Sequence, residues 1–341
     1  MLGPHMTGSN IWGTIIVTLS FSKTYLLHAI FALSALHLAF LHSADTDSHQ
    51  QNLVERYLHL ATLYQTKCIT LFRREIADLS ASNSAACAAC ASFLSLIVWA
   101  TPGARGADLF LPSDTSSPAS LNKQSSGESL CSTQPESNLK SRNKSVPWYK
   151  IQRGGHHIVS KTYDWVSASA YHDIVGPWRE INYDHIFRYP LSTPISTISS
   201  SDAHNLADIT SCWSDAELSD EDIQALEETL QTLHYVFNLL SLASTSSGII
   251  LPTPPTQISA SIAALSWTTL LPSRFCDMVE DRIPQALILV AVYCVVLKRA
   301  EDLWWIKGKA ESLLAAVGQE LGGDGLWNKW LEWPRAEVEG C

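Results

Sequence analysis

The chain has 341 residues, which is enough to bury one large hydrophobic core or two ordinary ones without metal ions or disulfides. Only 16% of its residues are charged and 46% are hydrophobic, whereas roughly 25% of residues are charged in an average soluble domain. Much of the surface of its secondary structure must therefore face other protein or a ligand. The formal net charge of −10 excludes general electrostatic attraction to a phosphate backbone, so we expect no direct nucleic-acid contact from this chain.

The first six residues contain Gly-Pro-His-Met, which is typical of an expression-vector scar, and residues 1–10 are interpreted as a disordered start outside the fold. Three apolar runs, residues 25–44, 79–104 and 283–297, are too polar or too short to cross a bilayer, so we expect no membrane span. The eight cysteines lie mostly within apolar runs. This placement indicates reduced, buried thiols of an intracellular protein rather than a disulfide framework.

Residues 25–41 are apolar on all sides, which predicts a central helix rather than a surface helix. Its alanines form a stripe of small residues that would let a second helix approach closely: Ala29, Ala32, Ala35 and Ala39. From Asp47 to Phe72, apolar residues recur at steps of three and four with charges between them, which predicts a long amphipathic helix. Residues 84–99 predict a third helix, rich in Ala and Cys. Its Cys87 and Cys90 match a C-x-x-C motif, but no second pair lies at zinc spacing, so we expect no metal site.

Residues 112–146 are rich in Ser, Asn, Pro, Lys and Gln and predict a long disordered insertion, because such a segment buries too little apolar surface to offset its ordering entropy. An ordered element begins at Pro147, and an irregular region then runs through several prolines to Asp208. We interpret residues 11–341 as a single domain interrupted by the insertion.

Ser219 and Asp222 have the spacing of a capping box and precede an amphipathic helix over residues 223–240. Residues 258–271 and 273–279 predict two short helices, and Pro284 suits the first turn of the helix formed by the uncharged run 283–297. No run alternates apolar and polar residues for long enough to require a strand. The predicted fold is all-α, an irregular multi-helix bundle with a long disordered Ser/Pro-rich insertion.

The sequence contains no recognisable catalytic motif: His156-His157, His172-Asp173 and Asp184-His185 lack partner sets, and no nucleotide-binding glycine loop is present. We therefore expect neither an enzyme nor a cofactor. Five of the 12 tryptophans lie in the last 40 residues of the chain, beginning with the pair Trp304-Trp305. This pair is interpreted either as core filling at a helix junction or as the aromatic wall of an apolar ligand pocket. Gly308, three residues later, would permit a close approach of another backbone.

Several segments occur in an order that resembles the regulatory domain of fungal zinc-cluster transcription factors, in particular the branch of the sterol uptake control protein. The segments lie at residues 28–39, around Tyr57, at 84–100, at 148–159 and, most specifically, at 282–299, 304–310 and 327–334. The resemblance implies a helical regulatory domain that dimerises, encloses an apolar pocket for ergosterol and acts in the nucleus, with shuttling from the cytoplasm as a further expectation. The six-cysteine DNA-binding cluster of these factors is not found in this chain.

We accordingly expect a ligand-sensing regulatory domain and homodimer that binds a sterol such as ergosterol, or another apolar metabolite, near the closing segment. The alternative is a ligand-free scaffold for dimerisation and partner docking, with the tryptophans as core. The expected ligand-binding residues are Phe31, Tyr293, Leu297, Trp304, Trp305 and Gly308.

Overall fold

The computed structural model describes residues 11–43, 48–101, 106–111, 147–175, 199–214, 216–244, 260–322 and 325–340. Within these ranges the secondary structure is helical and no strand occurs, which confirms the all-α prediction. The expected disordered start at residues 1–10 and the expected insertion at 112–146 lie outside the described residues.

The N-terminal half comprises η2 (Ile11–Ile15), α1 (Ile16–Ser22), α2 (Thr24–His42), α3 (Ser48–Ala77), α4 (Ser84–Ala100), η3 (Gly106–Leu109), α5 (Trp148–Ser167) and η4 (His172–Ile174). The C-terminal half comprises α8 (Ser200–Ile209), η5 (Thr210–Cys212), α9 (Asp220–Ser244), α10 (Ala260–Leu270), α11 (Ser273–Glu280), α12 (Pro284–Arg299), α13 (Lys309–Glu320) and α14 (Asn328–Glu339).

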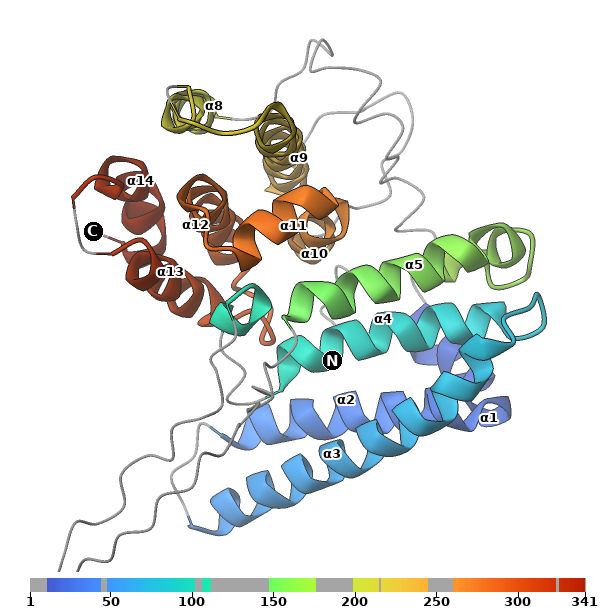
Figure 1. Cartoon of the computed structure of the whole chain (residues 1–341). Coiled ribbons are helices and arrows are strands. Elements are labelled where there is room, and N and C mark those ends of the chain that lie inside the picture. The colour runs from blue at the N-terminus through green and yellow to red at the C-terminus, as the bar shows by residue number, and fades with distance from the viewer. Residues whose placement is uncertain are drawn as a thin grey trace, which may run out of the picture.

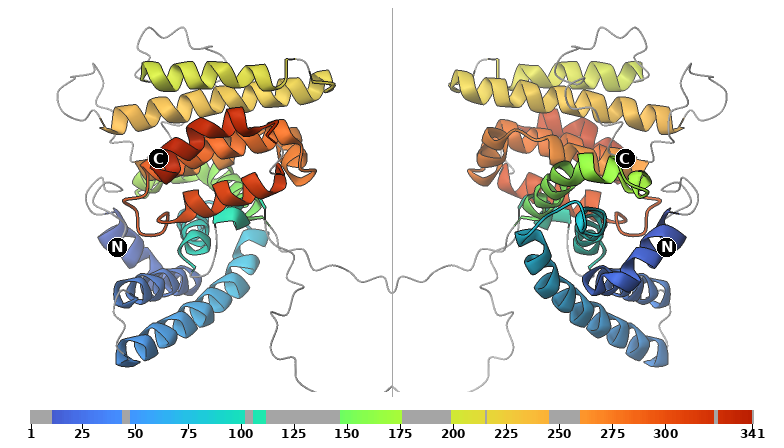
Figure 2. Two further views of the ribbon diagram at one scale, coloured as in Figure 1. Left: turned by 90° about the vertical axis from the view of Figure 1, so that its left-hand side faces the viewer. Right: turned by 90° about the vertical axis from the view of Figure 1, so that its right-hand side faces the viewer.

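The helices are stacked in layers (Figures 1 and 2). The antiparallel pair α2 and α3 forms one outer layer, α4 and α5 lie next to it, the helices α10 to α13 follow, and α8 and α9 form the opposite outer layer. Packing contacts connect the layers: α2 packs against α3 and α4, α4 against α5, α5 against α10, and α12 against α9. The hydrophobic core is therefore continuous through the stack.

Helix α12 is the most deeply buried element. Each of its residues from Ala286 to Leu297 has 0% exposure, and α9, α10, α11, α13 and α14 all pack against it. Pro284 occupies its first turn, as predicted, where a missing N–H costs no hydrogen bond. The Tyr293 hydroxyl, which would otherwise be an unpaired polar group in this core, donates a 2.5 Å hydrogen bond to the Ala264 carbonyl oxygen.

The capping box at the start of α9 forms as predicted. The Asp222 backbone N–H donates to the Ser219 Oγ at 3.2 Å, and the Ser219 N–H donates to Asp222 Oδ2 at 3.4 Å. Asp222 also accepts a 2.6 Å hydrogen bond from Arg274 Nε on α11. One side chain thus begins α9 and fixes the position of α11 beside it.

Two expectations were wrong. Helix α2 is not central: Phe31 is 42% exposed and Leu41 is 57% exposed, so only the face with the alanine stripe is buried. Residues 200–209, which we placed in an irregular region, form α8, because the Ser199 side chain caps the Asp202 N–H at 3.0 Å and Leu206 and Ile209 are buried. The prolines upstream of Ser199 had indicated irregular structure in this region.

By length and apolar composition alone, α2 could cross a membrane. Core helices of soluble proteins meet the same criterion. In this structure α2 packs against α3 and α4. The six described cysteines are buried and free, as expected, and no group of three or more metal-ligating side chains occurs among the described residues.

Gly106 makes a backbone contact that only glycine permits. Its N–H donates a 2.6 Å hydrogen bond to Ser312 Oγ, and a Cβ at this position would lie 1.8 Å from the Lys309 carbonyl oxygen. The short helix η3 therefore packs directly on the first turn of α13.

We expect Gly106→Ala to lower the free energy of unfolding by about 2 kcal/mol, since backbone must move to admit the methyl group. Urea denaturation measures this loss. Gly154→Ala is the matched control, because a Cβ there would have no atom of the described part of the chain within 4 Å, and alanine favours the helix. Equal stability of the two variants would contradict the contact.

Candidate functional site

The connection between α12 and α13 is held by a small network of charges. Lys298 Nζ lies 2.7 Å from Glu301 Oε2 and 2.6 Å from Glu311 Oε1, and Glu301 Oε1 accepts a 3.1 Å hydrogen bond from the Gly308 N–H. Hydrogen bonding to Lys298 lowers the pKa of Glu301, so the carboxylate is ionised at neutral pH. The turn that carries Trp304 and Trp305 is thereby closed at both ends.

The use of glycine at position 308 differs from our expectation. Among the described residues, no heavy atom lies within 4 Å of the place where a Cβ would be, so no described backbone segment approaches it. Instead its φ of +73° puts the residue in the left-handed region, directly before α13. Glycine is favoured here because a Cβ would be strained in that conformation.

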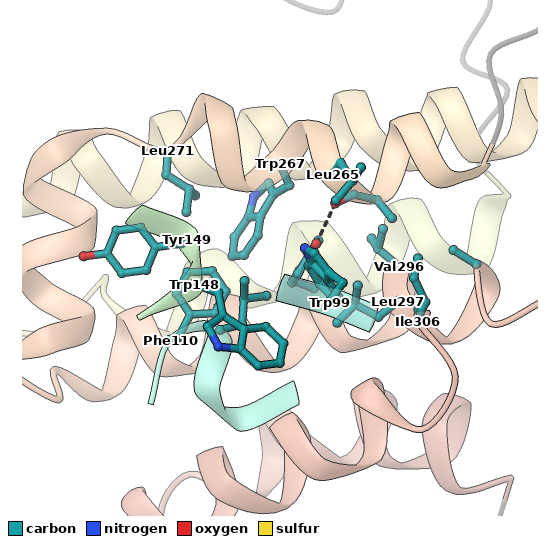
Figure 3. Packing of buried hydrophobic residues seen from close by; sticks show 14 of the residues in the cluster. Trp99, Phe110, Trp148, Tyr149, Leu265, Trp267, Leu271, Val296, Leu297 and Ile306 are labelled. Carbon is teal, nitrogen blue, oxygen red and sulfur yellow. Dashed lines mark hydrogen bonds between the residues drawn. The ribbon is translucent and has the colours of Figure 1, made fainter. Parts of the chain in front are cut away.

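The two tryptophans of the turn have different neighbours. Trp304 packs on α2, with its ring centre 5.1 Å from that of His37 and 5.4 Å from that of Phe40. Trp305 is 2% exposed and meets Trp99, at the end of α4, edge to face at 6.0 Å. Trp99 in turn meets Trp148 of α5 edge to face at 5.9 Å, and Figure 3 shows these two indoles within the buried cluster. The turn thus joins the C-terminal helices to the N-terminal layers.

A cleft of about 280 Å³ lies at this junction, where α2, α3 and the end of α4 meet the turn before α13. Its described lining residues are mostly apolar: Leu36, Ala39, Phe40, Ser43, Val54, Leu58, Trp99, Ala100, Thr101, Trp304, Trp305, Lys307 and Lys309. Trp99 and Trp305 are the most deeply buried aromatic residues of the set. An apolar wall with a few polar groups is the usual composition of a small-molecule site.

Lys307 and Lys309 are the charged residues among the described lining residues. The Lys309 Nζ lies 5.5 Å from the centre of the Trp148 ring, within range of a cation–π interaction. Burial lowers the pKa of Lys309 to about 8, although the negative charge of Asp108 on η3 opposes this shift. The ammonium group of Lys309 is therefore held in a partly dehydrated position.

The six residues expected from the sequence do not form one site. Trp304 and Trp305 line the cleft, and Gly308 lies between the two lining lysines in the chain. Tyr293 and Leu297 are fully buried in α12, and the Tyr293 ring stacks on Trp267 at 4.3 Å. Figure 3 shows Leu297 and Trp267 among the core side chains. Phe31 lies elsewhere on α2, with its ring 5.1 Å from that of Tyr64 on α3.

The residues that the sequence analysis missed come from the opposite wall of the cleft: Leu36, Ala39, Phe40, Ser43, Val54, Leu58, Trp99, Ala100 and Thr101. Most of them lie in helices that we predicted, but none was assigned to the site, since nothing in the sequence pairs α2 and α3 with a turn more than 200 residues away. Lys307 and Lys309 could have been found from the sequence, because they directly flank Gly308, which we had expected in the site.

Comparison with known proteins finds similarity to fungal transcription factors. Residues 1–105 match the family described as "Fungal specific transcription factor domain". Over 329 residues the chain is 22% identical to a Zn(2)-C6 fungal-type transcription factor of Gibberella zeae, and the match covers 95% of this chain and 56% of that protein. The chain thus spans about half the length of the relative it matches, and no solved structure matches it. The chain is therefore similar to a fungal-specific transcription factor domain over its first 105 residues and to a zinc-cluster factor over most of its length.

We expect Glu301→Gln to loosen the aromatic turn, because an amide cannot replace the charge that binds Lys298. The cost in stability should be about 1 kcal/mol or less, since the pair is partly exposed. Acrylamide quenching of tryptophan fluorescence should nevertheless increase as Trp304 becomes more accessible. Glu227→Gln, on the exposed side of α9, is the control. Quenching that is unchanged in Glu301→Gln would show that the network does not hold the turn.

Proposed function

We propose that this chain is the ligand-responsive regulatory domain of a fungal transcription factor and that the cleft at Trp304 and Trp305 binds a sterol such as ergosterol or another apolar metabolite. The observation that carries the proposal is the cleft itself, in which apolar side chains from α2, α3, α4 and the turn before α13 converge. The expected action is nuclear, with shuttling from the cytoplasm as part of the proposal.

The energetic argument rests on the aromatic wall. Each Å² of apolar ligand surface removed from water contributes roughly 25 cal/mol, and flat rings bury a large area at little cost in side-chain entropy. The cleft volume of about 280 Å³ is close to the lower limit of small-molecule sites, which run from roughly 300 to 1,000 Å³. A ligand as large as a sterol would therefore place part of its body at the open side of the cleft or widen it.

A regulatory response requires that the ligand bind two conformations with different affinity. The cleft favours such a difference because its walls come from separate layers. Trp304 contacts His37 and Phe40 on α2, whereas its own turn is held to α12 and α13 by Lys298 and Glu301. A molecule that fills the cleft would strengthen the attachment between these layers, and its loss would weaken it.

The acidic charge of the chain supports a regulatory rather than a DNA-binding function within a longer transcription factor. With a formal net charge of −10, this domain has no general attraction to DNA. In the proposed function it controls a factor whose DNA-binding part lies in another segment.

A second candidate is a ligand-free scaffold that forms a homodimer or docks a partner, and a separate observation favours it. Helices α2 and α3 of the outer layer carry exposed large apolar side chains, Phe31 and Leu41 on α2 and Leu60 and Leu63 on α3. These four residues are called here the α2–α3 face. Exposed apolar patches on a folded domain are typical of interaction sites.

For the ligand-binding function, we expect ergosterol to raise the melting temperature and to change tryptophan fluorescence. Trp304→Ala should weaken binding by about tenfold, which corresponds to about 1.4 kcal/mol, since the ring contributes to the cleft wall. Trp165→Ala removes an exposed tryptophan from α5 and is the control. No thermal shift at saturating ergosterol would contradict sterol binding, and equal affinity of both variants would place the ligand elsewhere.

For the scaffold, we expect sedimentation velocity to show association that increases with protein concentration. Leu63→Glu should abolish it, because a charge on the α2–α3 face would have to be desolvated in the interface. Leu326→Glu changes an equally apolar exposed residue on the segment before α14 and should leave association unchanged. Association that survives Leu63→Glu would exclude the α2–α3 face as the interface.

A further inference from the structure

The outer layer formed by α2 and α3 differs in charge from the chain as a whole (Figure 1). The chain has 33 acidic and 23 basic residues. Helix α2 contains no Asp, Glu, Lys or Arg. In α3 the basic residues outnumber the acidic ones: Arg56, Lys67, Arg73 and Arg74 against Glu55 and Glu75. The layer is therefore locally basic on an acidic protein, which favours a partner of negative charge at short range.

One line of exposed side chains runs along α3 at alternating steps of four and three residues, which is the spacing of a coiled-coil seam. This line is called here the α3 stripe: Arg56, Leu60, Leu63, Lys67, Thr70 and Arg74. Residues at this spacing share one side of a helix, and all six are exposed. The stripe is about 27 Å long at 1.5 Å per residue, and its two leucines lie between cations.

Aromatic side chains extend the apolar part of the stripe towards α2. Tyr64 directly follows Leu63 and lies one helical turn beyond Leu60. Its ring centre lies 5.1 Å from that of Phe31, which is 42% exposed on α2. The Lys67 Nζ lies 5.6 Å from the centre of the Tyr64 ring, within range of a cation–π interaction. These contacts join apolar side chains of both helices and a cation in one continuous surface.

The two carboxylates of α3 lie beside the stripe rather than on it. Glu55 and Glu75 are each one residue away from an arginine of the stripe, and Glu75 Oε2 lies 3.7 Å from the Nζ of Lys23, directly before α2. One of the two negative charges is thus paired with a basic residue outside α3. Interactions between exposed charges are largely screened beyond roughly 8 Å at physiological salt. The cations of the stripe, rather than distant acidic residues of the chain, therefore decide which partner is attracted.

We propose that the α3 stripe binds an acidic amphipathic helix of a partner protein, with apolar side chains on Leu60 and Leu63 and carboxylates beside Arg56, Lys67 and Arg74. Helices dock on such surfaces through apolar residues at intervals of three, four and seven residues. A second copy of this chain fits less well, because a two-fold dimer would set the cations of the stripe against each other. This inference rests on the second candidate function, partner docking, and names the chemistry of the partner.

The test uses the full chain and three labelled synthetic peptides of about 21 residues, with binding measured by fluorescence anisotropy. The Glu peptide has leucines at the a and d positions of its heptads and glutamates at e and g. The Lys peptide has lysines in place of the glutamates, and the scrambled peptide has the composition of the Glu peptide with leucines on all sides of the helix. We expect the Glu peptide to bind about tenfold more tightly than either of the others. Net charge alone would favour the Lys peptide, because the chain has a formal net charge of −10.

Variants assign the preference to the stripe. Lys67→Glu should weaken binding of the Glu peptide about tenfold and strengthen binding of the Lys peptide, because it reverses a charge beside the leucines. Leu63→Ala should weaken binding of both peptides, since apolar contact area is lost. Lys161→Glu reverses an exposed charge on α5 and is the matched control. Lys67 and Leu63 are exposed, so both variants should keep the melting temperature of the parent protein.

The outcomes separate the acidic partner from the docking function itself. Preferential binding of the Lys peptide, lost in Leu63→Ala, would overturn the acidic partner and leave the α2–α3 face as a docking site. A preference for the Glu peptide that is unchanged in Lys67→Glu would overturn the assignment to the α3 stripe. No peptide binding, with self-association that Leu63→Ala abolishes in sedimentation velocity, would overturn the proposal in favour of a homodimer. No peptide binding and no self-association would overturn both the acidic partner and the scaffold function.

Discussion

The burial of α12 is the constraint on which the rest of the structure depends. A helix that is excluded from water on every side over twelve successive residues needs neighbours all around it, and five other helices supply them. Its backbone hydrogen bonds are satisfied within the helix, and the one hydroxyl in its centre, that of Tyr293, is paired. The chain can change direction only where α12 ends. Charged side chains first appear there, at Lys298 and Arg299, and both form ion pairs that position the segments that follow.

Arg299 and Lys298 form ion pairs with two different parts of the structure. Arg299 makes paired hydrogen bonds of 2.8 and 2.9 Å to Asp202 on α8 and also reaches Glu337 on α14. Burial alone would raise the pKa of Asp202, but the hydrogen bonds and charge of Arg299 outweigh this effect and lower it, so the pair stays ionised. Lys298 instead holds the aromatic turn. The C-terminal end of α12 therefore holds two parts of the structure. Arg299 binds the outer layer that contains α8, and Lys298 binds the turn beside the cleft.

The sequence was informative where periodicity and capping decide the structure. The capping box of Ser219 and Asp222, the proline at the start of α12 and the amphipathic pattern of α3 each predicted the observed element, because these signals act within a few residues. The position of α2 in an outer layer could not be predicted from the sequence. A helix that is apolar on all sides can be surrounded by neighbours or can keep one side exposed, and only tertiary packing decides between the two. The same limit applies to the cleft. Its tryptophans were recognisable as large apolar side chains, but its opposite wall on α2 and α3 depends on which layers meet.

The contact between Gly106 and the first turn of α13 bears on the order in which the molecule is built. The partners of the Gly106 N–H hydrogen bond are 206 residues apart, so closing this contact costs more loop entropy than the local pairing of α2 with α3. During synthesis the N-terminal helices emerge first. Trp99 can therefore not contact Trp305 until the C-terminal segment that contains Trp305 has left the ribosome. The wall on α2, α3 and α4 is thus an exposed apolar surface in the nascent chain. It becomes one wall of the cleft only in a chain that has been translated through α13.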